Sequence, residues 1–326
     1  MQDANDFASS AALHAGWAPP LWKLTPPPVN RQLAELVRLL TLERLEANLF
    51  RGASCDIGTP QVFGGQVLGQ ALAAAYSTVG RRDVHSLHAY FLRRGDFSAP
   101  IVYEVHRSRD GSSFSSRRVA ATQHGEQLLH MAVSFHEPEE GLEHELGMPD
   151  VPAPETLSDA RRLPEAAHSY VPEMFRATIK RDKPFEFRFV HPPRASHASG
   201  AVSGRQQFWF RAIARLPDDD TLHRCLLGYV SDYYLLAAAV RPHGVSGRRA
   251  IQFAASIDHA VWFHRPARVD EWLLYVMDSP SASSGRGLTR ASIFARNGHL
   301  VASTAQESLI RVRRSGRRQK VARLLI

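Results

Sequence analysis

The sequence predicts an α+β protein of two tandem repeats, each with a long central helix wrapped by a curled antiparallel sheet. Each half contains one long apolar run, "GGQVLGQALAAAY" over 64–76 and "GYVSDYYLLAAAV" over 228–240. Segments that alternate between apolar and polar residues follow each run, as expected for half-buried strands. One helix followed by about three antiparallel strands, repeated once, indicates two sheets that each curl around a helix.

Turn residues divide the expected strands from one another. They are Asp110-Gly111 and His124-Gly125 in the first half and Asn297-Gly298 in the second half. A further strand is predicted near "KPFEFRFV", which opens the second half.

A weak internal repeat supports this division into halves. "SLHAYFLRRG" over 86–95 resembles "IDHAVWFHRP" over 257–266, which sets His88 on His259 at an offset of 171. The two halves also share the order of helix, strand, turn and strand.

The second apolar run is predicted to belong to one continuous helix over 220–240. Asp218, Asp219 and Asp220 offer an N-cap and carboxylates that oppose the positive end of a helix. Pro242 and Gly244 supply the signal that ends it. Both sides of the run are apolar, so we expect this helix to be buried.

Asp232 lies inside this run, where a buried carboxylate is costly unless hydrogen-bond donors reach it. The residues alone leave two interpretations open: a structural acid bonded to neighbouring groups, and a catalytic carboxylate. His223, Arg224 and Asp232 interrupt the apolar run, and no stretch of about 20 apolar residues occurs elsewhere. The sequence therefore predicts no integral membrane segment.

Composition divides the chain into five regions, because residues 1–30 are rich in proline and the segment after 136 is rich in proline and charge. They are a disordered lead-in over 1–30, an N-terminal repeat over 31–136, a linker over 137–183, a C-terminal repeat over 184–312 and a basic tail over 313–326.

The net charge of +8 is concentrated at the carboxyl end, where the last 16 residues carry seven Lys and Arg and no acid. Such a tail could contact RNA, an acidic partner or a membrane surface, but a solvated tail is the favoured interpretation. Cys55 and Cys225 lie far apart, and the N-terminus lacks a basic segment followed by a long apolar one. These features predict a reduced, cytoplasmic protein.

Six segments, taken in order, resemble the acyl-CoA thioesterase II family, whose members have a double hotdog fold. They are "VFGGQVLGQAL", "SLHAYFLRRGD", "RDGSSFSSRR", "IDHAVWFHRP", "EWLLY" and "GHLVASTAQE", and the resemblance runs from about Arg31 to Val312. It implies hydrolysis of fatty acyl-CoA to fatty acid and CoA without metal or cofactor. It also implies a homodimer or tetramer.

The resemblance carries three functional residues to this chain: Asp232 in "GYVSD", Ser256 before "IDH" and Gln306 in "ASTAQE". It assigns them to a water molecule that attacks the thioester. Asp232 would accept a proton from that water, and Ser256 and Gln306 would orient it. Ser256 stands where many relatives have threonine and keeps the hydroxyl. Backbone N–H groups near Gly228 are candidates for polarising the thioester carbonyl.

The first half lacks this constellation, since the repeat sets Gly69, His85 and Ser134 against the three residues. We therefore expect one working site per chain, formed mainly by the second half. We also expect Gly69 to permit close approach by another chain segment or by CoA.

Two other functions stay open at this point. An acyl-CoA hydratase or dehydratase would need an acid–base pair, for which His259 is the nearest histidine, although its repeat partner His88 favours a role in folding. A non-catalytic acyl-CoA-binding or RNA-associated protein is the second alternative. A metal site at His124, His130 and His136 is not favoured, because no cysteine or acid completes it.

Overall fold

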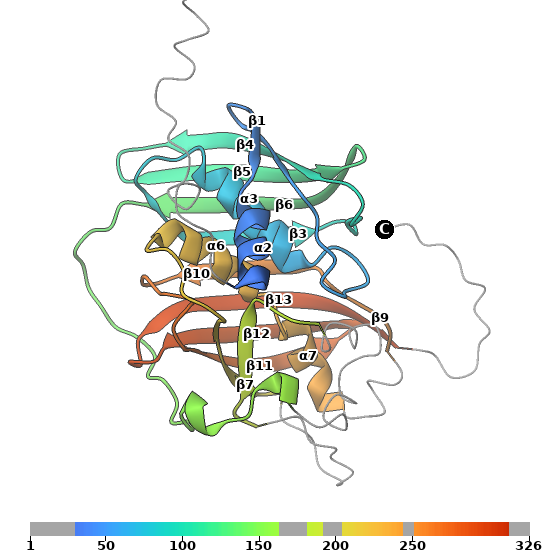
Figure 1. Ribbon diagram of the computed structural model, residues 1–326, viewed down its shortest axis with the longest axis vertical. Helices are drawn as coiled ribbons and strands as arrows, with labels where there is room; N and C mark the ends of the chain where they lie inside the picture. Colours follow the sequence, from blue (N-terminus) through green and yellow to red (C-terminus); the bar gives the residue numbers. More distant parts are fainter. Residues whose placement is uncertain (1–29, 163–180, 192–203, 244–250, 313–326) are drawn as a thin grey trace, which may run out of the picture.

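The computed structural model describes residues 30–162, 181–191, 204–243 and 251–312, and thirteen strands in these ranges form one sheet. Strands of the first half lie in the upper part of Figure 1 and those of the second half in the lower part, with α2, α3 and α6 gathered between them.

The described elements of the first half are α2 (Arg31–Leu40), β1 (Glu43–Glu46), β2 (Leu49–Gly52), α3 (Gly64–Tyr76), β3 (Asp83–Phe91), β4 (Ile101–Asp110), β5 (Phe114–Gln123) and β6 (Glu126–His136). Two 3₁₀ turns follow, η2 (Pro154–Thr156) and η3 (Ala160–Arg162).

Those of the second half are β7 (Phe185–Phe189), β8 (Gln206–Ala212), α6 (Asp220–Val230), α7 (Leu235–Val240), η5 (Arg241–His243), β9 (Ile251–Ser256), β10 (Asp258–Phe263), β11 (Leu273–Ser283), β12 (Arg286–Ala295) and β13 (Leu300–Val312).

The sheet is continuous across a seam where β3 pairs antiparallel with β10. Away from this seam the order is β3-β6-β5-β4-β2 in one direction and β10-β13-β12-β11-β8-β7 in the other. The strands on the two sides of the seam thus follow the same order along the chain.

Helix α3 has the predicted bounds and is buried over almost its whole length, because nearly all its side chains are small or apolar. It packs against α6, and glycines make the approach close. A Cβ at Gly69 would lie 3.3 Å from the Cys225 carbonyl oxygen and 2.9 Å from Leu40 Cδ2. Gly69 therefore permits close approach by other chain segments, which was one of the two roles expected for it.

The prediction of one continuous helix over 220–240 is wrong at residues 231–234, where a turn separates α6 from α7, while both ends of the predicted span are helical. The start is confirmed, since Asp219 is the N-cap and its side chain accepts a hydrogen bond from the Leu222 N–H at 2.9 Å. However, α6 ends at Val230, and Tyr234 has a left-handed backbone with φ of 68°. Ser231 Oγ also lies 2.9 Å from the Gly228 carbonyl oxygen, within reach of a local hydrogen bond that competes with helix continuation. Asp232 consequently lies in a turn rather than inside a helix.

The predicted strands and turns agree with the structure. Asp110 ends β4 and the 124–125 turn joins β5 to β6. His124, Gly125 and Gly298 all have positive φ, of 52°, 77° and 96°, which suits the His-Gly and Asn-Gly pairs of these turns. The strand expected near residue 185 is β7.

The repeat register predicted from the sequence is wrong, because it matches side chains that lie on opposite faces of the sheet. His88 is exposed, whereas His259 is 1% exposed and pairs across the seam with the buried Ala89. Because strand side chains alternate between faces, a shift of one residue moves each of them to the opposite side of the sheet. His88 and His259 are therefore not equivalent, and the argument that they share a folding role fails.

Sequence analysis did not identify α2, whose Asn30 cap accepts a hydrogen bond from the Leu33 N–H at 3.1 Å. The described part of the expected linker, 137–162, lies against the second half, where Trp209 Nε1 donates to the Pro152 carbonyl at 3.0 Å. The lead-in over 1–29 and the basic tail over 313–326 lie outside the described residues. Across the described ranges, no helix has the length and apolar character needed to cross a membrane.

Replacing Gly65 by alanine is expected to destabilise the fold by about 1–3 kcal/mol, because overpacking a filled interior forces neighbouring atoms apart. The added Cβ would overlap the Tyr229 carbonyl oxygen on the facing helix segment. Gly80→Ala is the matched control, since no atom lies within 4 Å of its Cβ position. Urea unfolding of both variants measures the difference, and equal midpoints would contradict this account of the helix contact.

Candidate active site

Asp232 lies in the turn after α6, and its carboxylate reaches the amino end of α3 from the other half. The Gly65 N–H donates to Asp232 Oδ2 at 2.9 Å. Phe63, the N-cap residue of α3, makes no side-chain cap, so Asp232 supplies that acceptor instead. The positive end of the helix dipole stabilises a carboxylate in this position. A Cβ at Gly64 would lie 2.7 Å from Oδ2, so glycine is required where the chain passes the acid.

Burial raises the pKa of Asp232 to about 7, against the effect of the hydrogen bonds from Gly65 and Ser256, which lower it. The surrounding protein removes water from the charged form, although the residue as a whole keeps intermediate exposure. A carboxylate with a pKa near neutrality can exchange a proton with a substrate water at physiological pH.

The structure brings the other two predicted residues to Asp232. Ser256 ends β9, and its Oγ lies 3.5 Å from Asp232 Oδ1. Gln306 lies on β13, and its Nε2 donates to Ser256 Oγ at 2.9 Å and to Ser308 Oγ at 3.2 Å. The three side chains therefore form one connected group, although their chain positions are far apart.

His259 extends this group and was missed as part of it by sequence reasoning. Its Nδ1 lies 2.8 Å from Gln306 Oε1 and its Nε2 lies 2.8 Å from Ser231 Oγ. Burial lowers the pKa of His259 to about 4, so the ring is neutral at physiological pH. The alternation of β10 could have revealed this, since His259 lies on the same inward face as Val261 and Phe263.

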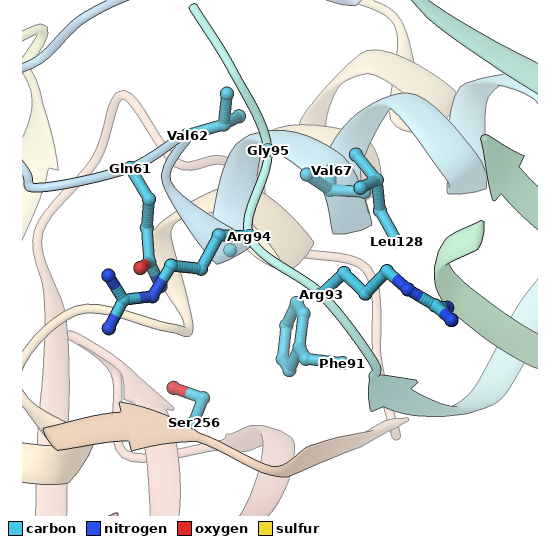
Figure 2. A pocket seen from close by; sticks show the side chains of 10 residues that line it. Gln61, Val62, Val67, Phe91, Arg93, Arg94, Gly95, Leu128 and Ser256 are labelled. Atoms are coloured by element: carbon cyan, nitrogen blue, oxygen red, sulfur yellow. The ribbon is translucent and has the colours of Figure 1, made fainter. Parts of the chain in front are cut away.

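A small cavity of about 60 Å³ lies between the two halves beside this group. Figure 2 shows the Ser256 hydroxyl on the side of the cavity where Phe91 and Arg94 lie. Apart from Ser256, the lining comes from the first half: Gln61, Val62, Gly64, Val67, Phe91, Arg93, Arg94, Gly95 and Leu128. A cavity of this volume can hold water molecules, each of which needs about 10–15 Å³.

Two family models match the chain, "Acyl-CoA thioesterase" over residues 179–309 and "Acyl-CoA thioesterase N-terminal domain" over 51–136. Acyl-CoA thioesterase 2 of Haemophilus influenzae is 39% identical over 280 residues, which cover 86% of this chain and 98% of that protein. The chain belongs to the acyl-CoA thioesterase family. Human acyl-coenzyme A thioesterase 8 is 37% identical, over 88% of this chain and 92% of the relative.

Solved structures agree with this family and with a hotdog fold. The acyl-CoA thioesterase II TesB2 of Mycobacterium marinum is 41% identical with a TM-score of 0.71, covering 87% of this chain and all of that one. A protein from Alicyclobacillus acidocaldarius, described as having a hot dog fold, has a TM-score of 0.68 at 20% identity, over 85% of this chain and 98% of its own. The second likeness concerns the fold alone.

The structure places Gly228, near which backbone donors to the thioester carbonyl were expected, against a helix of the first half. Gly228 lies in the last turn of α6 and faces Leu72, with its Cβ position 3.7 Å from Leu72 Cδ2. The backbone donor that reaches the acid is the Gly65 N–H, at the amino end of α3. The first half therefore supplies a donor to the acid as well as most of the cavity lining, whereas the predicted site residues all come from the second half.

Positive charge lies at the edge of the cavity. Arg93 Nε pairs with Glu126 at 2.9 Å, and the Arg94 guanidinium lies 4.5 Å from the centre of the Phe253 ring.

Among the residues with described positions, no group of three or more His, Cys, Asp or Glu is placed to hold a metal ion.

Replacing Asp232 by asparagine is expected to stabilise the fold in a pH-dependent way. The pKa of Asp232 is about 7 in the folded chain and 3.8 for an ordinary aspartate, so the folded state holds this proton more tightly. Wild-type stability therefore falls as pH rises between these values, while the amide has no such loss. The Tm of Asp232→Asn relative to wild type should be higher at about pH 8 than at about pH 5 by scanning calorimetry. A Tm difference that is the same at both pH values would contradict a raised pKa.

Proposed function

We propose that this chain hydrolyses fatty acyl-CoA thioesters to free fatty acid and CoA through Asp232, Ser256 and Gln306. The observation that carries the proposal is a carboxylate with a pKa of about 7 that is hydrogen-bonded at a helix amino end and lies beside a hydroxyl on a cavity. Membership of the acyl-CoA thioesterase family supports the substrate class.

In the proposed reaction a water molecule in the cavity is the nucleophile. Its oxygen attacks the thioester carbonyl carbon while Asp232 takes one of its protons. The tetrahedral intermediate then collapses, the carbon–sulfur bond breaks, and the CoA thiolate leaves and receives that proton. A thioester is already activated, so an oriented water and a base near neutrality are sufficient.

Ser256 and Gln306 have distinct positions in this scheme. Ser256 borders the cavity and can contact the water directly. Gln306 is 1% exposed and its amide donates to two serine hydroxyls, so it orients the water through Ser256. This assignment refines the expectation that both side chains touch the water.

The amino end of α3 is the proposed site for the thioester carbonyl. Gly64 lines the cavity there, and helix amino ends favour developing negative charge on oxygen. Arg94 at the cavity edge is suited to the phosphates of CoA, which are dianionic or monoanionic groups that arginine binds well.

We propose that residues 31–136 and 184–312 are two tandem hotdog repeats, each curled round its own helix. The matching strand order on both sides of the β3–β10 seam supports this division. The two family models also match separate ranges, 51–136 and 179–309. A homodimer or tetramer and a cytoplasmic location stay predictions from the sequence.

The geometry disfavours the hydratase alternative. A hydratase histidine must reach the acyl chain, but His259 is 1% exposed and both its ring nitrogens have partners within the protein. Incubation with an enoyl-CoA separates the two reactions, because hydrolysis releases thiol and hydration removes the conjugated double bond. Thiol release across acyl chain lengths then tests the proposal and defines the preferred substrate.

Asp232→Asn is expected to lower kcat by roughly 10²–10⁴-fold, because the amide keeps the shape and cannot accept the proton. In the wild type, kcat/KM should rise with pH to a plateau above about 7, where the carboxylate is ionised. Asp258→Asn is the matched control: its side chain accepts the Glu307 N–H at 2.7 Å, which asparagine can also do, and turnover should stay within a few-fold. Near-normal thiol release by Asp232→Asn would reject the assignment.

Ser256→Thr is expected to stay within a few-fold of the wild type, because the hydroxyl that bonds Gln306 and Asp232 is kept. Ser256→Ala and Gln306→Ala should each lower kcat by roughly tenfold or more through a misplaced water. Steady-state kinetics on one acyl-CoA substrate measures all three variants. Full activity in both alanine variants would mean that these residues do not orient the water.

A further inference from the structure

A chain of hydrogen bonds runs from the buried end of the site to Asp232, and His259 lies in its middle. Ser231 Oγ lies 2.8 Å from His259 Nε2, and His259 Nδ1 lies 2.8 Å from Gln306 Oε1. Beyond Gln306 the chain continues through Ser256 Oγ to the carboxylate. His259 touches neither the cavity nor the acid, so any effect on the reaction passes through Gln306.

The direction of each bond depends on which ring nitrogen of His259 carries the hydrogen. Gln306 Oε1 is an acceptor and needs the Nδ1–H, while the Ser231 hydroxyl can donate or accept. Burial holds the pKa of His259 at about 4, so the ring has only one N–H. Two arrangements of the hydrogen-bond chain are compatible with a neutral His259 ring.

In the first arrangement Nδ1 carries the hydrogen. His259 then donates to Gln306 Oε1, Gln306 Nε2 donates to Ser256, and the Ser256 hydroxyl is left to donate to Asp232. The Ser231 hydroxyl turns from the Gly228 carbonyl to Nε2, which requires only rotation about one bond.

In the second arrangement Nε2 carries the hydrogen and donates to Ser231. Gln306 must then turn its amide over to donate to Nδ1, and its Oε1 takes the Ser256 hydrogen. Asp232 Oδ1 loses its side-chain donor in that case. An unpaired oxygen on a buried carboxylate costs more than one on the neutral Gly228 carbonyl, so the first arrangement is favoured.

We propose that His259 is a positioning residue of this site: its Nδ1–H tautomer fixes the Gln306 amide, which directs the Ser256 hydroxyl at Asp232. The inference rests on the proposed function of Asp232 but concerns a residue that does not contact substrate. Without the Nδ1–H, Gln306 is free to turn, and Ser256 points its hydrogen away from the acid.

The pH dependence of kcat/KM can detect the loss of the hydrogen bond from Ser256 to Asp232. The titratable side chains that face it are Tyr229, Tyr233 and Tyr275, and burial holds the pKa of each above that of an ordinary tyrosine. None of them titrates near neutrality. Loss of the Ser256 donor would therefore appear as an upward shift of the Asp232 ionisation in the pH dependence of kcat/KM.

The first experiment determines the tautomer in the intact wild-type protein. Two-dimensional ¹⁵N–¹H spectra of ¹⁵N-histidine-labelled protein distinguish a protonated from a bare ring nitrogen, and the His259→Gln spectrum identifies the resonances. We expect Nδ1 protonated and Nε2 bare. A protonated Nε2 with a bare Nδ1 overturns the proposal, whatever the activity of any variant.

The second experiment compares two amides at this position. Asparagine places its N–H near the Nδ1 position, whereas glutamine reaches only toward Ser231. His259→Asn should keep kcat within about tenfold, while His259→Gln should lose about 10²-fold in kcat with little change in KM and an upward-shifted pH profile. His88→Asn, on the exposed face of the neighbouring strand, is the control and should behave as wild type.

Two kinetic outcomes reject the positioning role. One is wild-type turnover in His259→Gln, and the other is an equal loss in both variants with an unshifted pH profile, which indicates a purely structural residue. Circular dichroism and Tm exclude misfolding, and the tautomer assignment decides the question if either variant is unstable. Activity in Asp232→Asn would refute the proposed function instead, and would leave the tautomer measurement unaffected.

Discussion

The contact between the Asp232 carboxylate and the amino end of α3 is the constraint on which the site depends. It joins a turn of the second half to a helix of the first half through the Gly65 N–H. The same contact lets the acid be buried and suits the role that we propose for it, since the helix end stabilises the charge while desolvation raises the pKa. A single half would lack either the acid or its donor.

Close approach of the two helices makes this contact possible. Gly64, Gly65 and Gly69 present no side chain toward α6 and the turn after it, so backbone meets backbone or carboxylate directly. The β3–β10 seam fixes the two sheets in one continuous layer behind the helices. The two halves therefore contribute different parts of the site: the first forms most of the cavity wall, and the second supplies the acid, hydroxyl and amide.

The polar side chains of the site differ in how deeply they are buried, and this difference matches the roles that we propose for them. Asp232 keeps intermediate exposure and lies beside Gly64, which lines the cavity, and this position suits the proton exchange with water that we propose for it. His259 and Gln306 are each 1% exposed and have hydrogen-bond partners within the protein, which suits a support for the residues in front of them. The depth of burial thus separates the proposed base, Asp232, from the two side chains that we propose to support it.

The sequence by itself determined α3, the turns at 124–125 and 297–298, and the start of α6, because these follow from local periodicity, turn residues and capping. Family resemblance added Asp232, Ser256 and Gln306. The break after Val230 and the donor from Gly65 were decided only by the tertiary structure, whereas the alternation of β10 already places His259 on the inward face. Each depends on which segment packs on the opposite side, and a one-residue change of strand register, invisible in a weak repeat, moves a side chain from surface to core.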